Sequence, residues 1–403
     1  MDKIVYQQFD RVHGYFLLFF IVSIALIGTG FFAAWALDHY GHWITGMDNQ
    51  IVWGLPHVFA VFLIVAASGA LNIATIAAIF DRSEFKPLNR VSALIAIGLL
   101  IGGLSVLVLD LGRPDRLIIA MTYYNFSSVF TWNILFYVGF LAIVTLYIWV
   151  IMDRKMAHYY SIVSLIVFFW RLALTSATGL IFRLLIAREA YDAAILAPMF
   201  IAMSFSIGLA VFYLLMRTGL FVSARPIGNY LNDRLGKLLR IFVALVFYFV
   251  VISHLTNLYA SEHYGVEKFI LLSGGYFTAM FWLGQILLGT IIPLILLFPI
   301  KRSISELRLI FASVFTVLGG VMQIYIIIIG GQAYPLVLFP GYTLTSTFAD
   351  GLISYYIPSF FELLLGLGGF GIAIMVILIG SKILRIFPNN LEDNVIDPHY
   401  NHQ

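Results

Sequence analysis

The densest group of charged residues beside a long apolar run is Asp110-Leu111-Gly112-Arg113-Pro114-Asp115-Arg116. Gly112 can adopt the left-handed conformation that ends a helix, and Pro114 prevents the helix from resuming. We therefore expect Asp110 to face inward at the end of an apolar helix, with Arg113 near enough to pair with it. Such a carboxylate either forms a structural ion pair or exchanges protons with a redox ligand.

Histidine and hydroxyl side chains that could exchange protons with a ligand stand beside two other apolar runs. His57 opens one of them, directly after Pro56, which suits the first turn of a helix. A histidine there either anchors the chain at a membrane surface or, because imidazole titrates near neutral pH, exchanges a proton with a quinone. Tyr123 and Tyr124 precede another run, either as hydrogen-bond donors or as interfacial aromatic residues.

Arg171 is the most costly residue of the sequence, because it lies near the middle of an apolar run. A charge there costs at least ~2.5–3.5 kcal/mol and must face the interior of a helix bundle. Glu362 is a candidate partner for it, and such a pair would either order the bundle or belong to a proton path. Further candidates for an internal polar track are His254, Asn257, Gln285 and Gln323.

These residues are positioned by apolar runs that are long enough to cross a membrane. Sixty-two per cent of the residues are hydrophobic and only 11% are charged, too few charges to cover a soluble protein. A membrane helix needs ~20 mostly apolar residues, and the runs lack the alternation of a barrel strand. We therefore predict an all-α integral membrane protein. Its ten transmembrane helices are expected at Gly14–Leu37, Pro56–Phe80, Val91–Leu109, Ser127–Met152, Tyr159–Ile181, Ile195–Met216, Leu238–Tyr259, Gly275–Phe298, Leu307–Gly330 and Tyr355–Leu384.

The distribution of positive charge predicts the orientation. Most of the 23 Lys and Arg residues lie in the N-terminal segment and in alternate connections between the runs. The intervening connections hold only Arg113, Arg116, Arg183, Arg188 and Lys268. Because cytoplasmic loops carry the excess of Lys and Arg, both termini are predicted to be cytoplasmic.

The sequence is thus expected to consist of a cytoplasmic N-terminus (1–13), a transmembrane domain (14–386) and a cytoplasmic tail (387–403). The tail is polar and contains Pro388 and Pro398, and we expect it to be a poorly ordered end.

Several kinds of site are excluded or not expected. Without cysteine, neither a disulfide nor a cysteine-ligated zinc or iron–sulfur site can form within this sequence. Only His57 and His254 lie in or near the runs, whereas haem in a helix bundle usually needs facing histidine pairs, so we expect no haem and no metal. No Walker or Rossmann glycine motif is present. The net charge of +3 gives no basic stripe for nucleic acid.

Several motifs resemble one family of membrane subunits. They are Lys86-Pro87-Leu88, Gly102-Gly103-Leu104-Ser105, Asp110-Leu111-Gly112-Arg113-Pro114, Ala66-Ala67-Ser68-Gly69-Ala70 and Ser127-Ser128. With them the protein resembles, over nearly its whole length, the family that includes the membrane subunits of polysulfide reductase, of formate-dependent nitrite reductase (NrfD) and of hydrogenase-2. The ten runs fit the longer branch of that family. The favoured subgroup is the set of members that act in sulfur metabolism, including the complex linked to dissimilatory sulfite reductase.

The resemblance implies a fold and a site. It implies two four-helix bundles with flanking helices, a quinone bundle at about 55–182 and a second bundle at about 193–330. It also implies a quinone pocket near the outer surface. There Asp110 matches an acidic or histidine position, with Arg113 beside it, and His57 approximates a histidine or asparagine position about one turn away. Tyr123 or Tyr124 would match a tyrosine donor.

The resemblance therefore implies a quinone-interacting membrane anchor of a respiratory oxidoreductase in the cell inner membrane, using menaquinone or ubiquinone. A ferredoxin-like iron–sulfur subunit is expected on the outer, periplasmic face, with further catalytic or cytochrome subunits and membrane lipid as other partners. Proton movement would involve Arg171, Glu362 or His254. Two alternatives remain at this point. One is a secondary transporter that uses Arg171 and Glu362 as an intramembrane site, and the other is a purely structural anchor.

Overall fold

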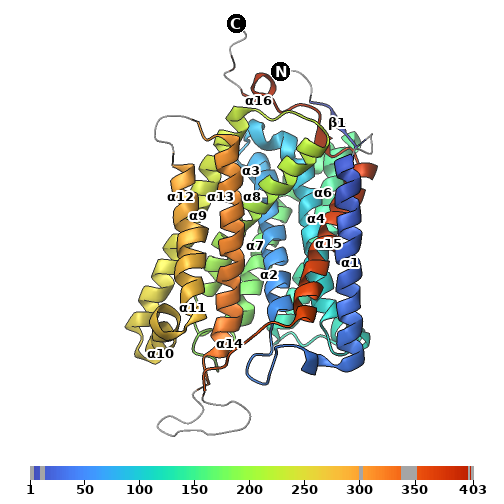
Figure 1. Cartoon of the computed structure of the whole chain (residues 1–403). Coiled ribbons are helices and arrows are strands. Elements are labelled where there is room, and N and C mark those ends of the chain that lie inside the picture. The colour runs from blue at the N-terminus through green and yellow to red at the C-terminus, as the bar shows by residue number, and fades with distance from the viewer. Residues whose placement is uncertain (1–3, 10–13, 299–302, 337–351, 398–399, 401–403) are drawn as a thin grey trace.

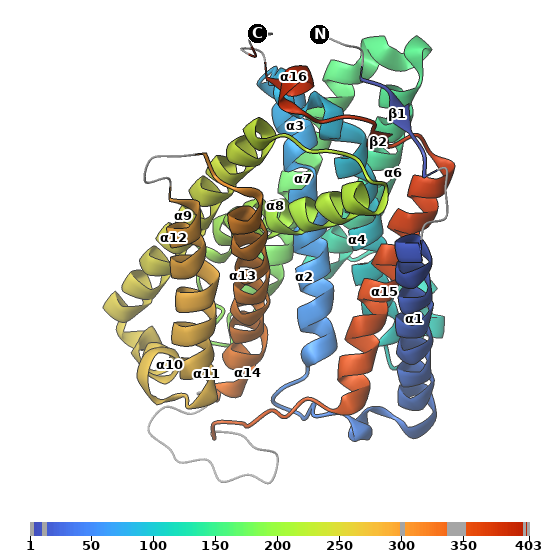
Figure 2. The same ribbon diagram turned by 45° about the horizontal axis from the view of Figure 1, so that its top comes forward.

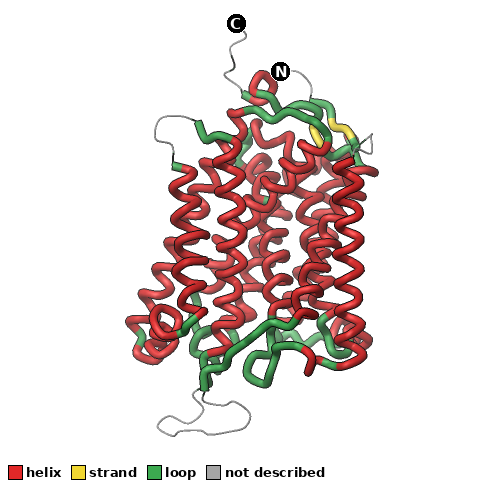
Figure 3. Tube along the Cα trace, in the orientation of Figure 1, coloured by secondary structure: helices red, strands yellow, loops and turns green. Residues whose placement is uncertain are grey.

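The computed structural model describes residues 4–9, 14–298, 303–336, 352–397 and 400. In these residues ten helices are long and apolar enough to cross a membrane, and each coincides with a predicted run. The helices stand side by side, and the described segments near the two termini, residues 4–9 and 387–397, lie together at one end of the molecule (Figure 1). We call that the terminal end, and the opposite one the Asp110 end. Figure 3 shows that most of the described residues are helical.

The first five spans begin with α1. It covers Gly14–Tyr40 and is followed by a short turn, η1, at His42–Ile44. The second span is α2 (Leu55–Ala70) with α3 (Asn72–Ile79), and the third is η2 (Ser83–Leu88) with α4 (Asn89–Leu109). After η3 (Pro114–Arg116) and the short α5 (Leu117–Thr122), the fourth and fifth spans are α6 (Val129–Met152) and α7 (Tyr160–Arg183), with η4 (Arg154–Tyr159) between them.

The second half adds α8 (Leu196–Val222), α9 (Asn229–Tyr259) and α15 (Phe360–Ile383). A hairpin of η5 (Ser261–His263), α10 (Tyr264–Lys268) and η6 (Phe269–Ser273) leads to the eighth span. This span runs from α11 (Tyr276–Ala279) through the π-helix η7 (Met280–Ile291) to α12 (Ile292–Leu297). The ninth runs from α13 (Glu306–Tyr325) through the π-helix η8 (Ile326–Gly330) to α14 (Gly331–Ala333).

Helix α2 is the centre of the molecule, because it packs against α4, α7, α8 and α15. Its small residues make the crossing with α8 possible: a Cβ atom added at Gly69 would lie 1.7 Å from the carbonyl oxygen of Ser204. Helix α1 instead turns large apolar side chains such as Phe31 and Trp35 outward, as a lipid-facing helix does. On its other face α1 packs along α15, which also packs on α4 (Figure 2).

The C-terminal segment is more ordered than predicted, up to residue 397. Strand β2 (Phe387–Pro388) pairs antiparallel with strand β1 (Tyr6–Gln7) near the N-terminus, and the ring of Phe387 stacks on Phe9 at 4.9 Å. The short helix α16 (Asp393–Ile396) then packs on α9. The prediction failed for this part because its few apolar side chains are buried by another segment, which local polarity does not reveal. Pro398 lies outside the described residues.

Candidate functional site

Asp110 lies where helix α4 ends. Its backbone N–H still donates to the carbonyl of Val106, and its side chain is only 2% exposed, so it faces inward as predicted. The prediction for Gly112 was wrong, since this glycine does not have a positive φ. The helix ends instead in a right-handed turn at Asp110, and Pro114 starts the next turn.

Two histidines meet the carboxyl group of Asp110. His57, in the first turn of α2, places Nδ1 3.2 Å from Oδ2. His42, from the turn after α1, places Nε2 3.9 Å from Oδ1 and 2.9 Å from the backbone oxygen of Asp110. The three residues therefore join the ends of three separate spans. His42 was missed, because the sequence analysis considered only the histidines in or near the apolar runs.

The hydrogen-bonding capacity of this cluster is not fully satisfied by the described residues. Both carboxyl oxygens of Asp110 and Nδ1 of His57 are buried, yet none has an aligned hydrogen bond to a described residue. Buried polar groups nearly always have a partner, so these three atoms retain hydrogen-bonding capacity that the described residues do not use. A quinone or quinol fits this donor and acceptor set, because its ring oxygens can accept from an imidazole and donate to a carboxylate.

Asp110 is also prepared to hold a proton. It directly follows the last residue of its span, and burial, with a smaller contribution from the charge of Glu362, raises the pKa of its carboxyl group to about 7. A carboxyl group that titrates near neutral pH can take up a proton and release it again during turnover.

Arg113 does not pair with Asp110, which corrects the prediction. Its guanidinium group instead donates to both carboxyl oxygens of Asp115 at 3.0 Å, and this pair is exposed. The backbone turns away from the bundle after α4, so that Arg113 points outward whereas Asp110 points inward. Tyr123 is 82% exposed and Tyr124 37% exposed, and neither makes a described hydrogen bond to Asp110. Arg113, Tyr123 and Tyr124 therefore lie on the exposed surface of the Asp110 end.

Glu362 belongs to the Asp110 end and not to a pair with Arg171. It is the third residue of α15, in a capping box with Ser359, and is completely buried. The hydroxyl group of Tyr356 donates to its Oε1 at 2.5 Å. The error has a simple cause: the tenth run was predicted to start at Tyr355, whereas α15 starts at Phe360, so Glu362 was placed more than one turn too deep.

Arg171 is deeply buried without an acidic partner among the described residues. Its Nε and Nη1 atoms lack hydrogen bonds, and its guanidinium carbon lies 5.2 Å from the ring centres of Phe168 and Phe205. These ring contacts partly replace a counter-charge. Among the described residues Glu362 therefore does not form the expected ion pair with Arg171.

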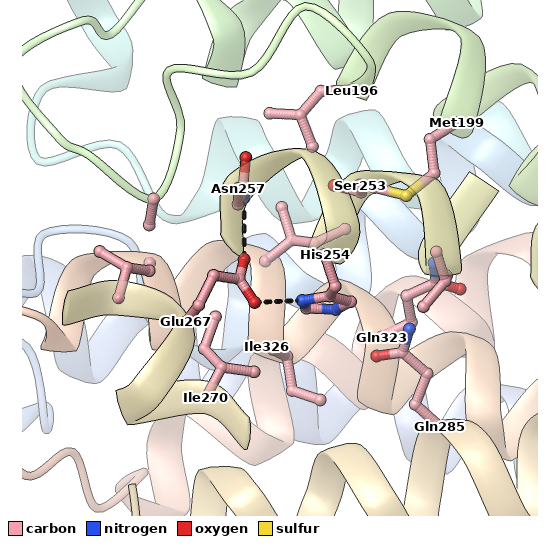
Figure 4. A pocket seen from close by; sticks show the side chains of 15 residues that line it. Leu196, Met199, Ser253, His254, Asn257, Glu267, Ile270, Gln285, Gln323 and Ile326 are labelled. Carbon is pink, nitrogen blue, oxygen red and sulfur yellow. Dashed lines mark hydrogen bonds and ion pairs between the residues drawn. The ribbon is translucent and has the colours of Figure 1, made fainter. Parts of the chain in front are cut away.

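A second polar region lies in the other helix group, toward the same end. His254 and Asn257 on α9 bind the carboxylate of Glu267 on α10, at 2.6 Å and 2.8 Å. Figure 4 shows this group beside a cavity of about 60 Å³, into which Gln285 and Gln323 also project. The four residues predicted for an internal polar track thus line a single cavity. Glu267, only 1% exposed, was missed because a lone acid beside Lys268 has the sequence pattern of a surface turn.

Comparison with known proteins places this architecture in a family. The family model described as polysulphide reductase, NrfD matches residues 43–335. The protein is 27% identical over 401 residues to an Hdr-like menaquinol oxidoreductase integral membrane subunit of Archaeoglobus fulgidus, covering 97% of this chain and 99% of the relative. It is 24% identical over 416 residues to a subunit of the selenate reductase of Mesobacillus selenatarsenatis, covering 93% and 95%.

A shorter relative, one of the subunits of the polysulfide reductase of Wolinella succinogenes, is 24% identical over 309 residues, with 71% of this chain and 96% of the relative covered. The family model spans well over half of the sequence, and the ten apolar helices agree with a membrane subunit. This multi-pass integral membrane protein therefore belongs to the polysulphide reductase, NrfD family.

Proposed function

We propose that this protein is the quinone-interacting membrane subunit of a respiratory oxidoreductase complex, with Asp110 and His57 as its proton-exchanging residues. The observation that carries the proposal is the Asp110–His57–His42 cluster, in which the buried carboxyl oxygens of Asp110 and the buried Nδ1 of His57 have no aligned partner. The names of relatives support it, since one is a menaquinol oxidoreductase subunit and another belongs to a polysulfide reductase.

Each residue has a definite task in this proposal. A bound quinone or quinol supplies two-electron, two-proton redox chemistry. The carboxylate of Asp110 takes one proton from a quinol hydroxyl or returns it to a quinone oxygen, and its pKa of about 7 suits both directions. His57 exchanges the other proton at Nδ1, and its place in the first turn of α2 fixes its distance to Asp110. His42 binds the backbone oxygen of Asp110 and so holds the end of α4.

The electrons must pass to or from another subunit by way of a redox centre, because this protein has no cysteine with which to ligate an iron–sulfur cluster. We infer a ferredoxin-like iron–sulfur subunit bound over the Asp110 end, with further catalytic or cytochrome subunits beyond it. By the charge distribution this end would be periplasmic and the membrane the cytoplasmic one. Menaquinone is the favoured quinone, because it is the one in a relative's name.

Proton movement through the second helix group is a further part of this proposal. The cavity beside His254 and Glu267 exceeds the volume that one water molecule needs, and its lining supplies several polar partners. A buried carboxyl group next to a cavity that has room for water can pass a proton on during turnover. Arg171 and Glu362 do not line this cavity, so His254 is the only member of the predicted path that we retain.

The proposal as a whole is tested by isolating the native complex through a tag on this protein. We expect an iron–sulfur protein to co-purify and the complex to exchange electrons with a water-soluble menaquinol analogue. Isolation of a functional single protein that moves a solute without quinone would favour a transporter instead.

A further inference from the structure

Glu362 and Tyr356 come from a part of the sequence that the family model does not include. That model ends at residue 335, so both residues lie beyond it. They enter the Asp110 end because α15 packs against α4 and α2, the helices that carry Asp110 and His57. The site is therefore bordered by an element outside the matched region.

Hydrogen-bond donors surround the carboxyl group of Glu362. Its Oε2 accepts the backbone N–H groups of Gly46, at 2.8 Å, and Ser359, at 2.7 Å, while Oε1 accepts the hydroxyl group of Tyr356. The carboxylate also lies in the first turn of the long helix α15, where the helix dipole favours an anion. Each hydrogen bond described for the carboxyl group of Glu362 thus comes from a donor, and the side chain has no exposure to solvent.

Tyr356 connects the carboxyl group of Glu362 to α2, the helix that carries His57. Its hydroxyl oxygen accepts the backbone N–H of Leu55, at 2.7 Å, in the first residue of α2, and donates to Glu362. Space for the contact depends on Gly54, where an added Cβ atom would lie 2.3 Å from Oε1 of Glu362 and 2.8 Å from the Tyr356 hydroxyl. The glycine before Leu55-Pro56-His57 thus makes room for the carboxylate.

We propose that Glu362 is a positioning residue of the Asp110 site, a buried acid that α15 places behind the first turn of α2, and that Tyr356 holds it there. The inference rests on the proposed function and names a residue that acts on Asp110 without touching the quinone. Electrostatics support it, since the charge of Glu362 is one of the two causes that raise the pKa of Asp110.

Other titratable groups also face Asp110 and must be kept constant in any test. His57 approaches it from α2 and His42 from the turn after α1. On the segment that follows α4, Arg113 and Asp115 are exposed and neutralise each other. Among the described residues, Glu362 is thus the acid whose charge is identified as acting on Asp110.

The test is the pH profile of quinol oxidation by the intact complex carrying Glu362→Gln. Asp110 must be deprotonated to accept a quinol proton, so the rate rises as pH passes the pKa of Asp110. Loss of a nearby negative charge lowers that pKa, and we expect the half-maximal rate to move to lower pH by about 1 unit. The rate plateau at high pH should remain.

Three further variants make the result decisive. Glu362→Asp keeps the charge and should retain the wild-type profile, and Glu262→Gln is the matched neutralisation of an exposed acid at the same end. Tyr356→Phe removes only the hydroxyl donor and should give a smaller shift in the same direction, which tests the idea even if Glu362→Gln does not assemble. A merely structural Glu362 would reduce the amount of complex without moving the midpoint.

Unchanged midpoints in both Glu362→Gln and Tyr356→Phe would overturn the inference. The proposed function would survive that result as long as Asp110→Asn still abolishes turnover. If Asp110→Asn left the turnover normal, the proposed function itself would fall, so the two failures are distinguishable.

Discussion

Asp110 and Arg171 are both charged residues removed from water, but their surroundings differ. Asp110 has two histidines within 4 Å. Burial raises the pKa of its carboxyl group to about 7, so this group can become neutral by taking up a proton near neutral pH. Arginine stays protonated in proteins, and Arg171 has only aromatic rings beside it. The first arrangement suits proton exchange, whereas the second leaves a positive charge without a described counter-charge.

This contrast predicts the effect of replacing Arg171. Arg171→Met keeps a long side chain and removes an uncompensated charge that costs at least ~2.5–3.5 kcal/mol. We expect the variant to reach the membrane at the wild-type level or above and to unfold at the same or a higher temperature in detergent. The measurement is membrane abundance with thermal unfolding, and Arg113→Met, at an exposed position, is the control. Depletion of Arg171→Met alone would mean that an anion from a ligand or partner compensates Arg171.

The sequence identified the residue types of the site better than their partners. Asp110 and His57 stood out because each is polar at the end of an apolar run, and the structure brings them to 3.2 Å. Arg113 was assigned to Asp110 because spacing along the sequence shows proximity but not direction. His42 and Tyr356 reach the site from distant loops, 68 residues before Asp110 in one case. No local pattern predicts such contacts, since they depend on how α1 and α15 pack.

At the scale of elements, hydropathy predicted all ten spans because a membrane imposes length and apolar composition on every one of them. It could not predict the π-helices η7 and η8, which border the cavity beside His254. Hydropathy does not distinguish a π-helix from an α-helix, since both can be equally apolar. The ordered segment from Phe387 to Asp397 was missed because its pairing partner is near the other end of the chain.

The predicted orientation of the elements can be tested by labelling. The protein has no cysteine, so single cysteines introduced at Asp38, Ser83 and Asn390 have no background. Asp38 and Ser83 are exposed at opposite ends of the helices. We expect an impermeant maleimide added to whole cells to label position 38 and to reach positions 83 and 390 only after lysis. The reverse pattern would invert the predicted topology. Thr343, another predicted outer position, lies outside the described residues.

At the scale of the whole molecule, two polar regions occupy different helix groups and serve different tasks in this account. The Asp110 cluster joins α1, α2 and α4, whereas the His254–Glu267 group joins α9 and α10 and meets side chains of η7 and α13. Quinone chemistry is assigned to the first region and proton transfer to the second. Separate regions allow one task to be removed while the other is kept.

Neutralising Glu267 should therefore uncouple the two tasks. Glu267→Gln keeps the size of the side chain and removes the buried carboxylate that binds His254 and Asn257. In proteoliposomes holding the complete complex, we expect near-normal quinol oxidation with fewer protons moved per electron. Glu262→Gln, in the same hairpin but exposed, should leave both quantities unchanged. An unchanged proton-to-electron ratio in Glu267→Gln would rule out this cavity as part of a proton path.

The central claim, that Asp110 exchanges a proton with quinol, is tested most directly by Asp110→Asn. The amide has nearly the volume of the carboxyl group but cannot take up a proton. In the assembled complex we expect quinol oxidation to fall by ~10²–10⁴-fold, as for loss of a general base. The wild-type rise in rate as pH passes about 7 should disappear with it. Asp115→Asn, at the exposed pair, should behave like wild type. Wild-type turnover and an unchanged pH profile in an assembled Asp110→Asn complex would contradict the account.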